Sequence, residues 1–367
     1  MLIDYKDTGL PTYDIDLQEA PEDRWKCMVE AERSNLESLF QEVLDLVEVD
    51  PKLLPRIFRP LVATGRGLLA GKAIPRIAAL FGQEYVKEIN GVARTADLPV
   101  GHVFLANLMY DLVLAAERTE WLVEKGRGYV RRWRGACSSY SSLIRGHPVL
   151  VRNMDWNLPE SIGKHTRVVR FHRGNQFYTT VSVLGSVGVL SAMMKGKWAV
   201  TLNQAPIGSQ KLNVFQWPVM HRIRNVCDQM QSYAETVDEL QAYQTMTPFY
   251  AHVVGVSASE QTVVMGRGKY FYERPVEEDI LIQTNHSIGC AEEDNPTREG
   301  FKDPSGATYF YDTYPRFEAL ESRLKKRPTT LDAALKKLAQ QPVTHDATQQ
   351  QMLLRPATGT MRLKIRC

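Results

Sequence analysis

The sequence has few cysteines, and none of its cysteines or histidines has the spacing of a metal site. Its five cysteines are odd in number, widely scattered and without a CxxC pair, which argues against a disulfide framework and indicates a reducing compartment. No glycine-rich phosphate loop occurs either, because GSVGVL at residues 185–190 has the pattern of a hairpin turn between strands. We therefore expect neither a metal nor a cofactor.

The chain also lacks an excess of charge and an apolar leader. Its 45 Lys and Arg against 42 Asp and Glu leave a formal net charge of +3, which argues against a nucleic-acid partner. The opening MLIDYKDTGLPTYDIDL has no basic start followed by an apolar run, so no signal peptide is expected. These absences predict a cytoplasmic protein, either free or peripheral at a membrane.

Apart from these absences, the chain changes its pattern at Cys137. Apolar residues recur at helical spacing over residues 20–49, whereas residues 117–136 break this periodicity, end in arginines and predict an exposed connector. After Cys137, short runs alternate between apolar and polar residues and are cut by Gly or Pro, as in β-strands. The sequence predicts an α+β protein with a mainly helical N-terminal segment, residues 1–136, and a strand-rich segment, residues 137–367.

Cys137 heads a hydroxyl-rich strand in CSSYSSLIRGHPVLVRNMDW. A turn at RGHP folds the next strand back, so that Arg152 is expected near Ser141 and Asp155 opposite Ser138. The charges matter because the thiolate is the nucleophilic form of cysteine, and a neighbouring arginine favours that form. The other four cysteines are interpreted as small buried apolar residues, and this is also the alternative for Cys137.

Cys137 has no histidine base nearby in the sequence, because His147 lies at the far end of the hairpin. Scission of the bond between Ala136 and Cys137 would create a free α-amino group, whose pKa of ~7.7–8.0 suits a base for the cysteine's own thiol. The small residues Gly135 and Ala136 allow the Ala136 carbonyl to approach the thiol for an N-to-S acyl shift. The hypothesis is therefore autocatalytic cleavage between Ala136 and Cys137.

Five segments that follow one another from Thr12 onward carry a family resemblance. They are TYDIDLQEAPEDRW, VARTADLPVGHVFLANLMYDL, CSSYSSLIRGHPVLVRNMDW, LGSVGVLSAMMKGKWAVTLNQ and LIQTNHS. In this order they resemble the acid ceramidase and N-acylethanolamine-hydrolysing acid amidase family, within the wider N-terminal-nucleophile amidases that include bile-salt hydrolases. The resemblance covers nearly the whole chain. It implies a four-layer αββα sandwich, in which two antiparallel sheets pack face to face between helices.

The resemblance also implies a catalytic role for each matched residue. Cys137 would be the nucleophile, and Arg152 would lie beside it. Asp155 would hold the new α-amino group, and Asn285 would donate a side-chain N–H to the oxyanion.

Two further residues, Asn203 and Arg316, are implied to bind the substrate. The chain departs from the family in its longer connector and in TNHSIGC, where the lysosomal members read TNYDHW. A glutamate that some members use has no clear match, and Glu235 and Glu239 are the nearest candidates. These departures leave the substrate open, and they support the alternative of a non-catalytic lipid-binding relative that never cuts itself.

The predicted reaction is hydrolysis of the linear amide of an N-acyl lipid, either N-acylethanolamine-like or ceramide-like, through a thioester at Cys137. The helices between Ile57 and Leu112 are expected to wall the acyl chain. Residues 57–89 are expected to contact a membrane surface, with an ordinary solvated face as the alternative. The two cleaved fragments are expected to stay associated.

Two other activities are alternatives to this reaction. One is hydrolysis of amino-acid or bile-salt-type N-acyl conjugates. The other is a thiol protease with a histidine base, which is disfavoured because Cys137 begins a strand instead of capping a helix.

Overall fold

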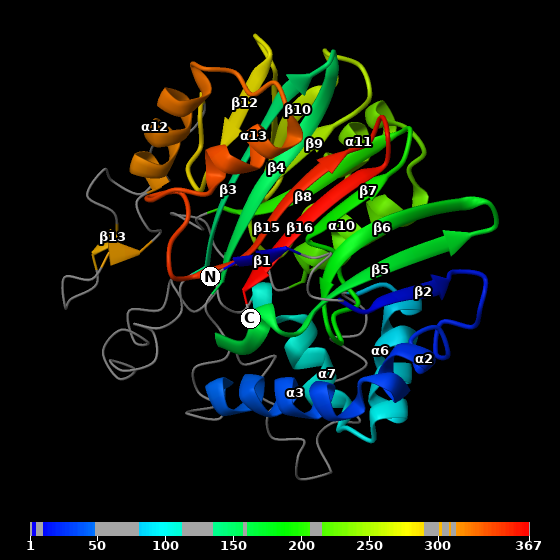
Figure 1. Ribbon diagram of the computed structural model, residues 1–367. Helices are drawn as coiled ribbons and strands as arrows, with labels where there is room; N and C mark the ends of the chain where they lie inside the picture. Colours follow the sequence, from blue (N-terminus) through cyan, green and yellow to red (C-terminus); the bar gives the residue numbers. More distant parts are fainter. Residues whose placement is uncertain are drawn as a thin grey trace.

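Two large β-sheets and their flanking helices make up the part of the chain that the computed structural model describes (Figure 1). The described residues are 2–4, 10–47, 81–111, 135–156, 160–205, 215–289, 301–302, 308–309 and 313–366.

The first sheet has six strands, and all neighbouring strands in it are antiparallel. In spatial order the strands are β1 (Leu2–Asp4), β16 (Thr360–Arg366), β15 (Thr348–Arg355), β4 (His147–Trp156), β3 (Gly135–Ile144) and β12 (Ile280–Gln283). The hairpin of β3 and β4 therefore lies inside the sheet, between strands from the C-terminal third of the chain.

The second sheet has eight strands and is antiparallel except at one edge, where β2 runs parallel to β5. In spatial order the strands are β11 (Tyr270–Pro275), β10 (Gln261–Arg267), β9 (Phe249–Val254), β8 (Trp198–Gln204), β7 (Ser191–Met194), β6 (Gln176–Val183), β5 (Thr166–Arg173) and β2 (Thr12–Asp16). A separate short pair joins β13 (Phe301–Lys302) to β14 (Thr308–Tyr309).

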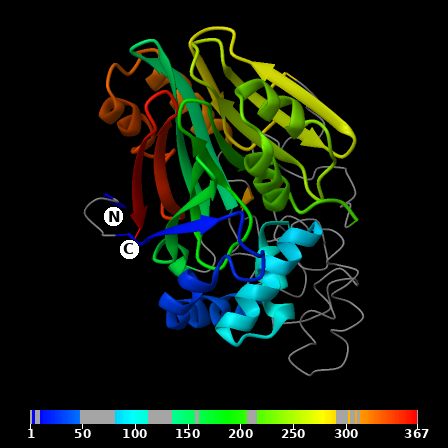
Figure 2. The ribbon, with the colours of Figure 1, turned by 90° about the vertical axis from the view of Figure 1, so that its right-hand side faces the viewer.

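The two sheets pack face to face on an apolar layer (Figure 2). Leu150, Met352 and Leu354 of the six-stranded sheet share one core cluster with Val181 and Ala199 of the eight-stranded sheet. The central strands are buried on both faces, so alternate side chains point to the other sheet and to the helices.

Helices cover the outer face of the six-stranded sheet. These are α12 (Thr313–Leu324) and α13 (Leu331–Leu338), whose Leu320 and Leu335 share a core cluster with Tyr140 of β3. Thr330 caps α13, because its hydroxyl accepts a hydrogen bond from the backbone N–H of Ala333.

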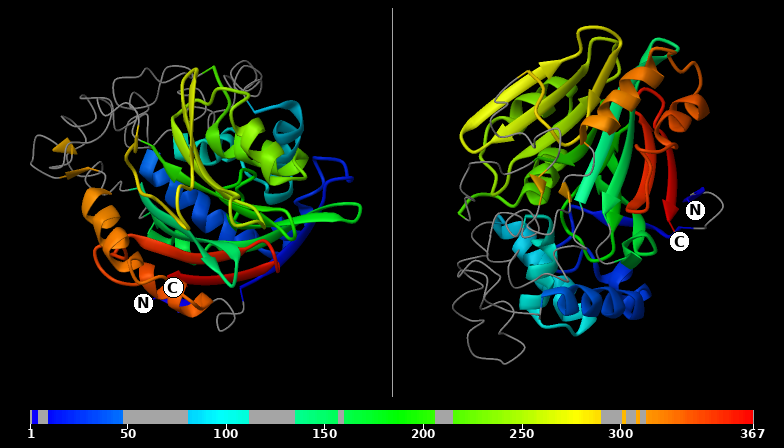
Figure 3. Two further views of the ribbon diagram at one scale, coloured as in Figure 1. Left: turned by 90° about the horizontal axis from the view of Figure 1, so that it is seen from above. Right: turned by 90° about the vertical axis from the view of Figure 1, so that its left-hand side faces the viewer.

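A larger group of helices packs with the eight-stranded sheet, some on its outer face and some at one end of the sheets (Figure 1). These helices are α2 (Lys26–Ala31), α3 (Arg33–Val47), α6 (Gln83–Ala96), α7 (Val100–Asn107), α10 (Val219–Gln229) and α11 (Tyr233–Leu240). Their apolar faces share the largest core cluster with Val200 and Leu202 of β8. The layers thus run helix, sheet, sheet and helix (Figure 3), which confirms the predicted α+β, four-layer αββα sandwich. Within the described residues, no helix combines the length and the apolar character needed to cross a membrane.

The N-terminal segment is less helical than expected, because β1 and β2 form one edge of each sheet. The strand β3 begins at Gly135, so Gly135 and Ala136 belong to the sheet and not to the connector. Residues 117–134 of the predicted connector lie outside the described residues, and the domain boundary at Cys137 stays a prediction.

The helix predicted over residues 20–49 is in fact two helices, α2 and α3, with a break at Glu32. The Glu32 carboxylate accepts hydrogen bonds from Arg167 Nε at 2.6 Å and Nη2 at 2.7 Å. These bonds lower the pKa of Glu32 to about 2, although burial opposes them. The break between the helices is thus tied to β5.

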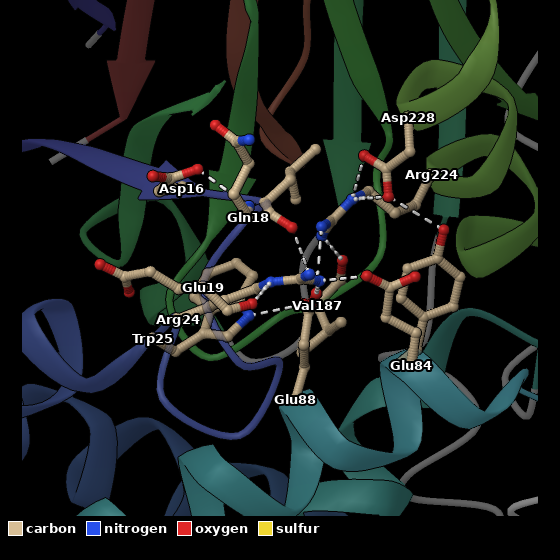
Figure 4. A network of polar contacts seen from close by, with 12 residues as sticks. Asp16, Gln18, Glu19, Arg24, Trp25, Glu84, Glu88, Val187, Arg224 and Asp228 are labelled. Carbon is tan, nitrogen blue, oxygen red and sulfur yellow. Dashed lines mark hydrogen bonds and ion pairs between the residues drawn. The ribbon is translucent and has the colours of Figure 1, made fainter. Parts of the chain in front are cut away.

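A cluster of buried charges joins the N-terminal helices to α10 (Figure 4). Arg24 Nη1 lies 2.8 Å from Glu88 Oε1, and Arg224 Nη2 lies 3.3 Å from the same oxygen. Trp25 Nε1 donates to Glu88 Oε2 at 2.7 Å, and Arg224 Nε donates to Asp228 Oδ1 at 2.8 Å. We call these five residues the Glu88 cluster. They come from both sides of Cys137, so the cluster links the two segments across the predicted cleavage site.

Candidate functional site

The hairpin of β3 and β4 closes with a two-residue turn at Arg145 and Gly146. Both residues have positive φ, 53° and 77°, as in the type I′ turns that favour tight hairpins. The turn sets a register in which Cys137 lies opposite Met154, and Arg152 lies opposite Ser139. The expected register was therefore wrong by two residues. The error arose because the turn residues are Arg145 and Gly146, with Ile144 paired to His147, whereas the assumed turn ran from Arg145 to Pro148.

The thiol of Cys137 faces the other sheet and is held by Arg152. Arg152 Nη2 donates to Cys137 Sγ at 3.2 Å and to the Leu202 carbonyl at 2.7 Å, while Nη1 donates to Ser191 Oγ at 2.9 Å. Arg152 is 1% exposed, and no carboxylate of the described residues pairs with it. The guanidinium is therefore placed to stabilise negative charge that develops on the sulfur during a reaction.

Asn285 and Arg316 hold the backbone of Cys137. The Cys137 N–H donates to Asn285 Oδ1 at 2.9 Å, and Arg316 Nη2 donates to the same oxygen at 2.8 Å. Arg316 Nη1 donates to the Cys137 carbonyl and to Ser138 Oγ, both at 2.7 Å. Asn285 Nδ2 donates to the Gln204 carbonyl at 2.7 Å. In the intact chain Arg316 therefore contacts the nucleophile's own backbone, and its role toward a substrate stays a prediction.

Asp155 lies opposite Ala136, on the face of the hairpin that points away from the Cys137 thiol. The Thr348 hydroxyl donates to Asp155 Oδ1 at 2.6 Å, and His345 Nε2 lies 3.4 Å from Oδ2. The carboxylate is fully buried beside the residue that precedes the predicted cleavage point. Its assignment to the new amine stays a prediction.

Asn203 also reaches the nucleophile strand. Its Nδ2 donates to Ser139 Oγ at 3.1 Å and to the Gln283 carbonyl at 3.0 Å. Its Oδ1 is buried and has no hydrogen-bond partner among the described residues. A buried oxygen in this state is available to a donor of a ligand, while the substrate-binding role itself stays a prediction.

His252 is a site residue that the sequence analysis missed. Its ring nitrogens lie 3.1 Å from the hydroxyls of Ser139 and Ser141, on the same strand as Cys137. Burial lowers the pKa of His252 to about 3, so the ring is neutral. His252 lies far from Cys137 in the sequence, and no local pattern connects β9 to β3.

An apolar pocket lies near this site, although Cys137 itself does not line it. It encloses about 640 Å³, including space open to solvent, and Met154, the residue opposite Cys137, is part of its wall. The lining residues are Leu39, Phe40, Val43, Ala106, Met109, Tyr110, Met154, Trp156, Ile162, Val183, Leu184, Gly185, Ser186, Leu190 and Met220. Of the helices between Ile57 and Leu112 that were expected to wall the acyl chain, α7 lines this pocket, and α3 lines it as well. Residues 57–80 lie outside the described residues, and the place of an acyl chain stays a prediction. Among the described residues, no three His, Cys, Asp or Glu side chains gather as metal ligands.

No protein-family model matches the sequence, but several characterised proteins do. N-acylethanolamine-hydrolyzing acid amidase of Caenorhabditis elegans is 26% identical over 260 residues, 69% of this chain and 66% of that protein. Acid ceramidase of Bos taurus is 22% identical over 266 residues, 70% of this chain and 63% of that protein. Acid ceramidase of Homo sapiens is 21% identical over 294 residues, with coverages of 76% and 70%. The chain thus spans a little under two thirds of the nematode and bovine proteins.

A solved structure of the Caenorhabditis elegans N-acylethanolamine-hydrolyzing acid amidase ortholog aligns with 60% of this chain and 93% of its own. The TM-score is 0.49 and the identity is 22%. The sequence matches relate the chain to the acid ceramidase and N-acylethanolamine-hydrolysing acid amidase family, as the five segments predicted.

Proposed function

We propose that the chain is an autoprocessed cysteine amidase that hydrolyses the C–N bond of N-acyl lipids. The observation that carries this proposal is the arrangement at Cys137. Its thiol is bound by the guanidinium of Arg152, and its N–H and carbonyl are held by Asn285 and Arg316, next to an apolar pocket.

The first reaction is cleavage of the chain itself. The Cys137 thiolate attacks the Ala136 carbonyl carbon, the C–N bond breaks, and a thioester joins the Ala136 carbonyl to Cys137 Sγ. The released nitrogen takes the proton that the thiol lost and becomes the α-amine of Cys137. Water then hydrolyses the thioester, which leaves a carboxylate on Ala136 and a free thiol. The buried carboxylate of Asp155, opposite Ala136, suits the new ammonium group.

The second reaction uses the same thiol on an external amide. The thiolate attacks the substrate carbonyl, and the α-amine passes its proton to the departing nitrogen as the C–N bond breaks. Water then releases the fatty acid from the thioester. Asn285 Nδ2 carries two hydrogens, of which the Gln204 carbonyl takes one, so the second suits a substrate oxyanion.

The pocket supports an acyl lipid as the substrate. Its wall is almost wholly apolar and reaches Met154, directly across the hairpin from Cys137. An alkyl chain lying there has its carbonyl end toward the thiol. The names of the matched relatives point to the same substrates, N-acylethanolamine-like or ceramide-like amides.

We further propose that the two fragments stay associated. The buried Glu88 cluster supports this, because it joins Arg24 and Glu88 of the first fragment to Arg224 of the second. The membrane contact expected of residues 57–89 is proposed for residues 57–80. Its C-terminal part is excluded because Phe81, Tyr85 and Ile89 are buried in the core. Flotation with anionic vesicles tests this contact. The expected cytoplasmic location stays a prediction, and cell fractionation checks it.

Denaturing electrophoresis tests the core of the proposal. Wild type is expected as fragments of 136 and 231 residues, the second being the 367 residues less the first 136, and Cys137→Ala is expected as one band. Mass spectrometry should identify Cys137 as a new N-terminus. Hydrolysis by a chain that stays intact would contradict the α-amine as base.

A substrate panel separates the alternatives. Long-chain N-acylethanolamine and ceramide are expected to be hydrolysed, and a bile-salt conjugate is not. Binding of the lipids by an uncleaved chain without hydrolysis would identify a non-catalytic relative instead.

A further inference from the structure

A polar patch interrupts the apolar layer between the sheets, directly beside Cys137. Ser139 and Ser141 occupy alternate positions of β3 after Cys137, so all three side chains face the eight-stranded sheet. His252 of β9 lies between the two hydroxyls, with Nδ1 at 3.1 Å from Ser139 Oγ and Nε2 at 3.1 Å from Ser141 Oγ. The neighbouring part of the layer consists of aliphatic and methionine side chains.

The His252 ring matches these hydroxyls chemically. It is fully buried, and burial, with a smaller effect of Arg274, holds its pKa near 3. The neutral ring has one donor and one acceptor nitrogen, and a hydroxyl serves either of them. Both nitrogens are therefore satisfied without a charge in the core.

A neighbouring strand holds the same hydroxyl. Asn203 Nδ2 of β8 donates to Ser139 Oγ at 3.1 Å. The adjacent strands β8 and β9 therefore both form a hydrogen bond with Ser139 of β3. Arg152 Nη2 bridges Cys137 Sγ and the carbonyl of Leu202, the residue before Asn203. Leu202 and Asn203, two consecutive residues of β8, thus contact Arg152 and Ser139 respectively.

We propose that His252 is a positioning residue for Cys137. It acts through Ser139 and Ser141, because its two hydrogen bonds fix β3 against the eight-stranded sheet and so keep Sγ within reach of Arg152. The inference rests on the proposed function, since it assigns His252 to the two reactions of Cys137. A misplacement of ~1 Å can cost about 10²-fold in rate, so a strand that shifts slightly loses most of its reactivity.

The main test is His252→Leu, which removes both hydrogen bonds and fills the position with an apolar side chain. A covalent fatty-acyl probe counts the active sites, so that kcat is expressed per reactive Cys137. This kcat is expected to fall about 10²-fold, while the KM for long-chain N-acylethanolamine stays unchanged. Fragment formation is expected to slow by a similar factor. His252→Asn, which can still bond Ser139, should recover part of the rate.

His221→Leu is a matched control. His221 is also fully buried with a pKa lowered by burial to about 3, but its nitrogens make no hydrogen bond within the described residues. Its ring packs on Phe81 and Tyr85 instead. This change should leave the rate per titrated site unchanged, because it removes no hydrogen bond of the described residues. An equal fall in both variants would overturn the proposal.

Ser141→Ala covers the case in which His252→Leu does not fold. It removes one hydroxyl and keeps the ring, so a smaller fall in the rate per titrated site is expected. A lower yield of folded Ser141→Ala with an unchanged rate would show that the patch only stabilises the fold, and would overturn the proposal.

A last readout does not depend on amide hydrolysis. Iodoacetamide alkylation of Cys137, located by peptide mass spectrometry, is expected to be slower in His252→Leu and Ser141→Ala than in wild type and His221→Leu, because Sγ moves away from the Arg152 guanidinium. Wild type that neither cleaves itself nor hydrolyses amides would refute the proposed function. Equal alkylation rates in all four proteins would refute the positioning role of His252.

Discussion

Two buried arginines show opposite uses of a charge in this core. In the Glu88 cluster, Arg224 lies 2.8 Å from Asp228 and 3.3 Å from Glu88. Although burial alone opposes the charged form, the two carboxylates raise the pKa of Arg224 well above its usual value. At the nucleophile, Arg152 is equally buried, but a thiol, a hydroxyl and a carbonyl surround it.

The difference indicates what each region is for. A cation matched by carboxylates is neutralised in place, so the Glu88 cluster serves assembly of the two segments. Arg152 contacts only neutral groups of the described residues, so no carboxylate offsets its positive charge. Its charge can therefore stabilise an anion that forms during the reaction, and the group that becomes an anion here is the thiol. Breaking the first region should therefore cost stability, and breaking the second should cost rate.

The largest effect is expected from Glu88→Ala in the uncleaved Cys137→Ala chain. This change leaves Arg24 and Arg224 with fewer partners in the core, and loss of a buried partner costs about 3–5 kcal/mol. Urea unfolding measures the free energy of unfolding. Glu84→Ala is the matched control, because Glu84 contacts the same Arg24 but its side chain is 47% exposed. The comparison fails if both changes cost the same.

Arg152→Met is expected to act on rate and not on assembly. Loss of a charge-bearing donor at the reacting atoms should slow scission and hydrolysis by about 10²–10³-fold, or ~2.7–4 kcal/mol of transition-state stabilisation. Fragment formation over time and kcat with a long-chain N-acylethanolamine measure the loss. A fall in unfolding free energy as large as that of Glu88→Ala would place Arg152 in the same structural class as Arg224.

A buried carboxyl group without a cation partner among the described residues extends the comparison through its dependence on pH. Asp111 accepts hydrogen bonds from the Thr247 hydroxyl at 2.6 Å and from the Val219 N–H at the start of α10. Within the described residues no cation pairs with it, and burial raises its pKa from 3.8 to about 7, against the effect of those bonds. The native state therefore holds a proton on Asp111 that the unfolded chain has lost between these two values.

This proton gives the sign of the effect. Because the folded protein binds more protons, its stability falls as the pH rises from about 4 to about 7 and is constant above that range. Between pH 5 and pH 8 the Asp111 contribution is about 2.7 kcal/mol, from 1.36 kcal/mol for each of about two pH units. Asp111→Asn, in the Cys137→Ala chain, should remove this part of the urea-unfolding difference between the two pH values. An identical pH dependence in both chains would show that Asp111 is ionised throughout.

The sequence reaches the nucleophile hairpin but not its surroundings. The change of periodicity at Cys137 and the alternation along β3 and β4 are local patterns, and they predicted the strand-rich segment and the hairpin that carries Arg152. The four layers and the places of Asn203, Asn285 and Arg316 near Cys137 were implied by the family resemblance of the five segments instead. The predicted register of the β3–β4 hairpin was wrong because Arg145 is a turn residue with positive φ, a conformation that is uncommon for arginine and that the sequence does not indicate.

The remaining contacts join residues that are far apart in the chain. His252 reaches β3 from the opposite sheet, and Glu88 meets Arg224 from another helix. Each lies in a segment whose own pattern is that of an ordinary strand or helix. Which strand faces which is decided by the packing of whole layers, so no spacing rule connects these pairs.

The smallest effect is expected at the pocket, which belongs to neither charged region. Ala106→Phe adds a phenyl group to the wall formed by α7 and shortens the space next to Met154. The kcat/KM for a long acyl chain should fall about tenfold relative to a short one, since the added group displaces a few methylenes worth ~1–3 kcal/mol in all. Ala319→Phe on α12, on the outer face of the six-stranded sheet, is the matched control and should leave the ratio unchanged. A constant ratio in Ala106→Phe would mean that the acyl chain lies elsewhere, and the nucleophile would then have to be approached from a different side of the hairpin.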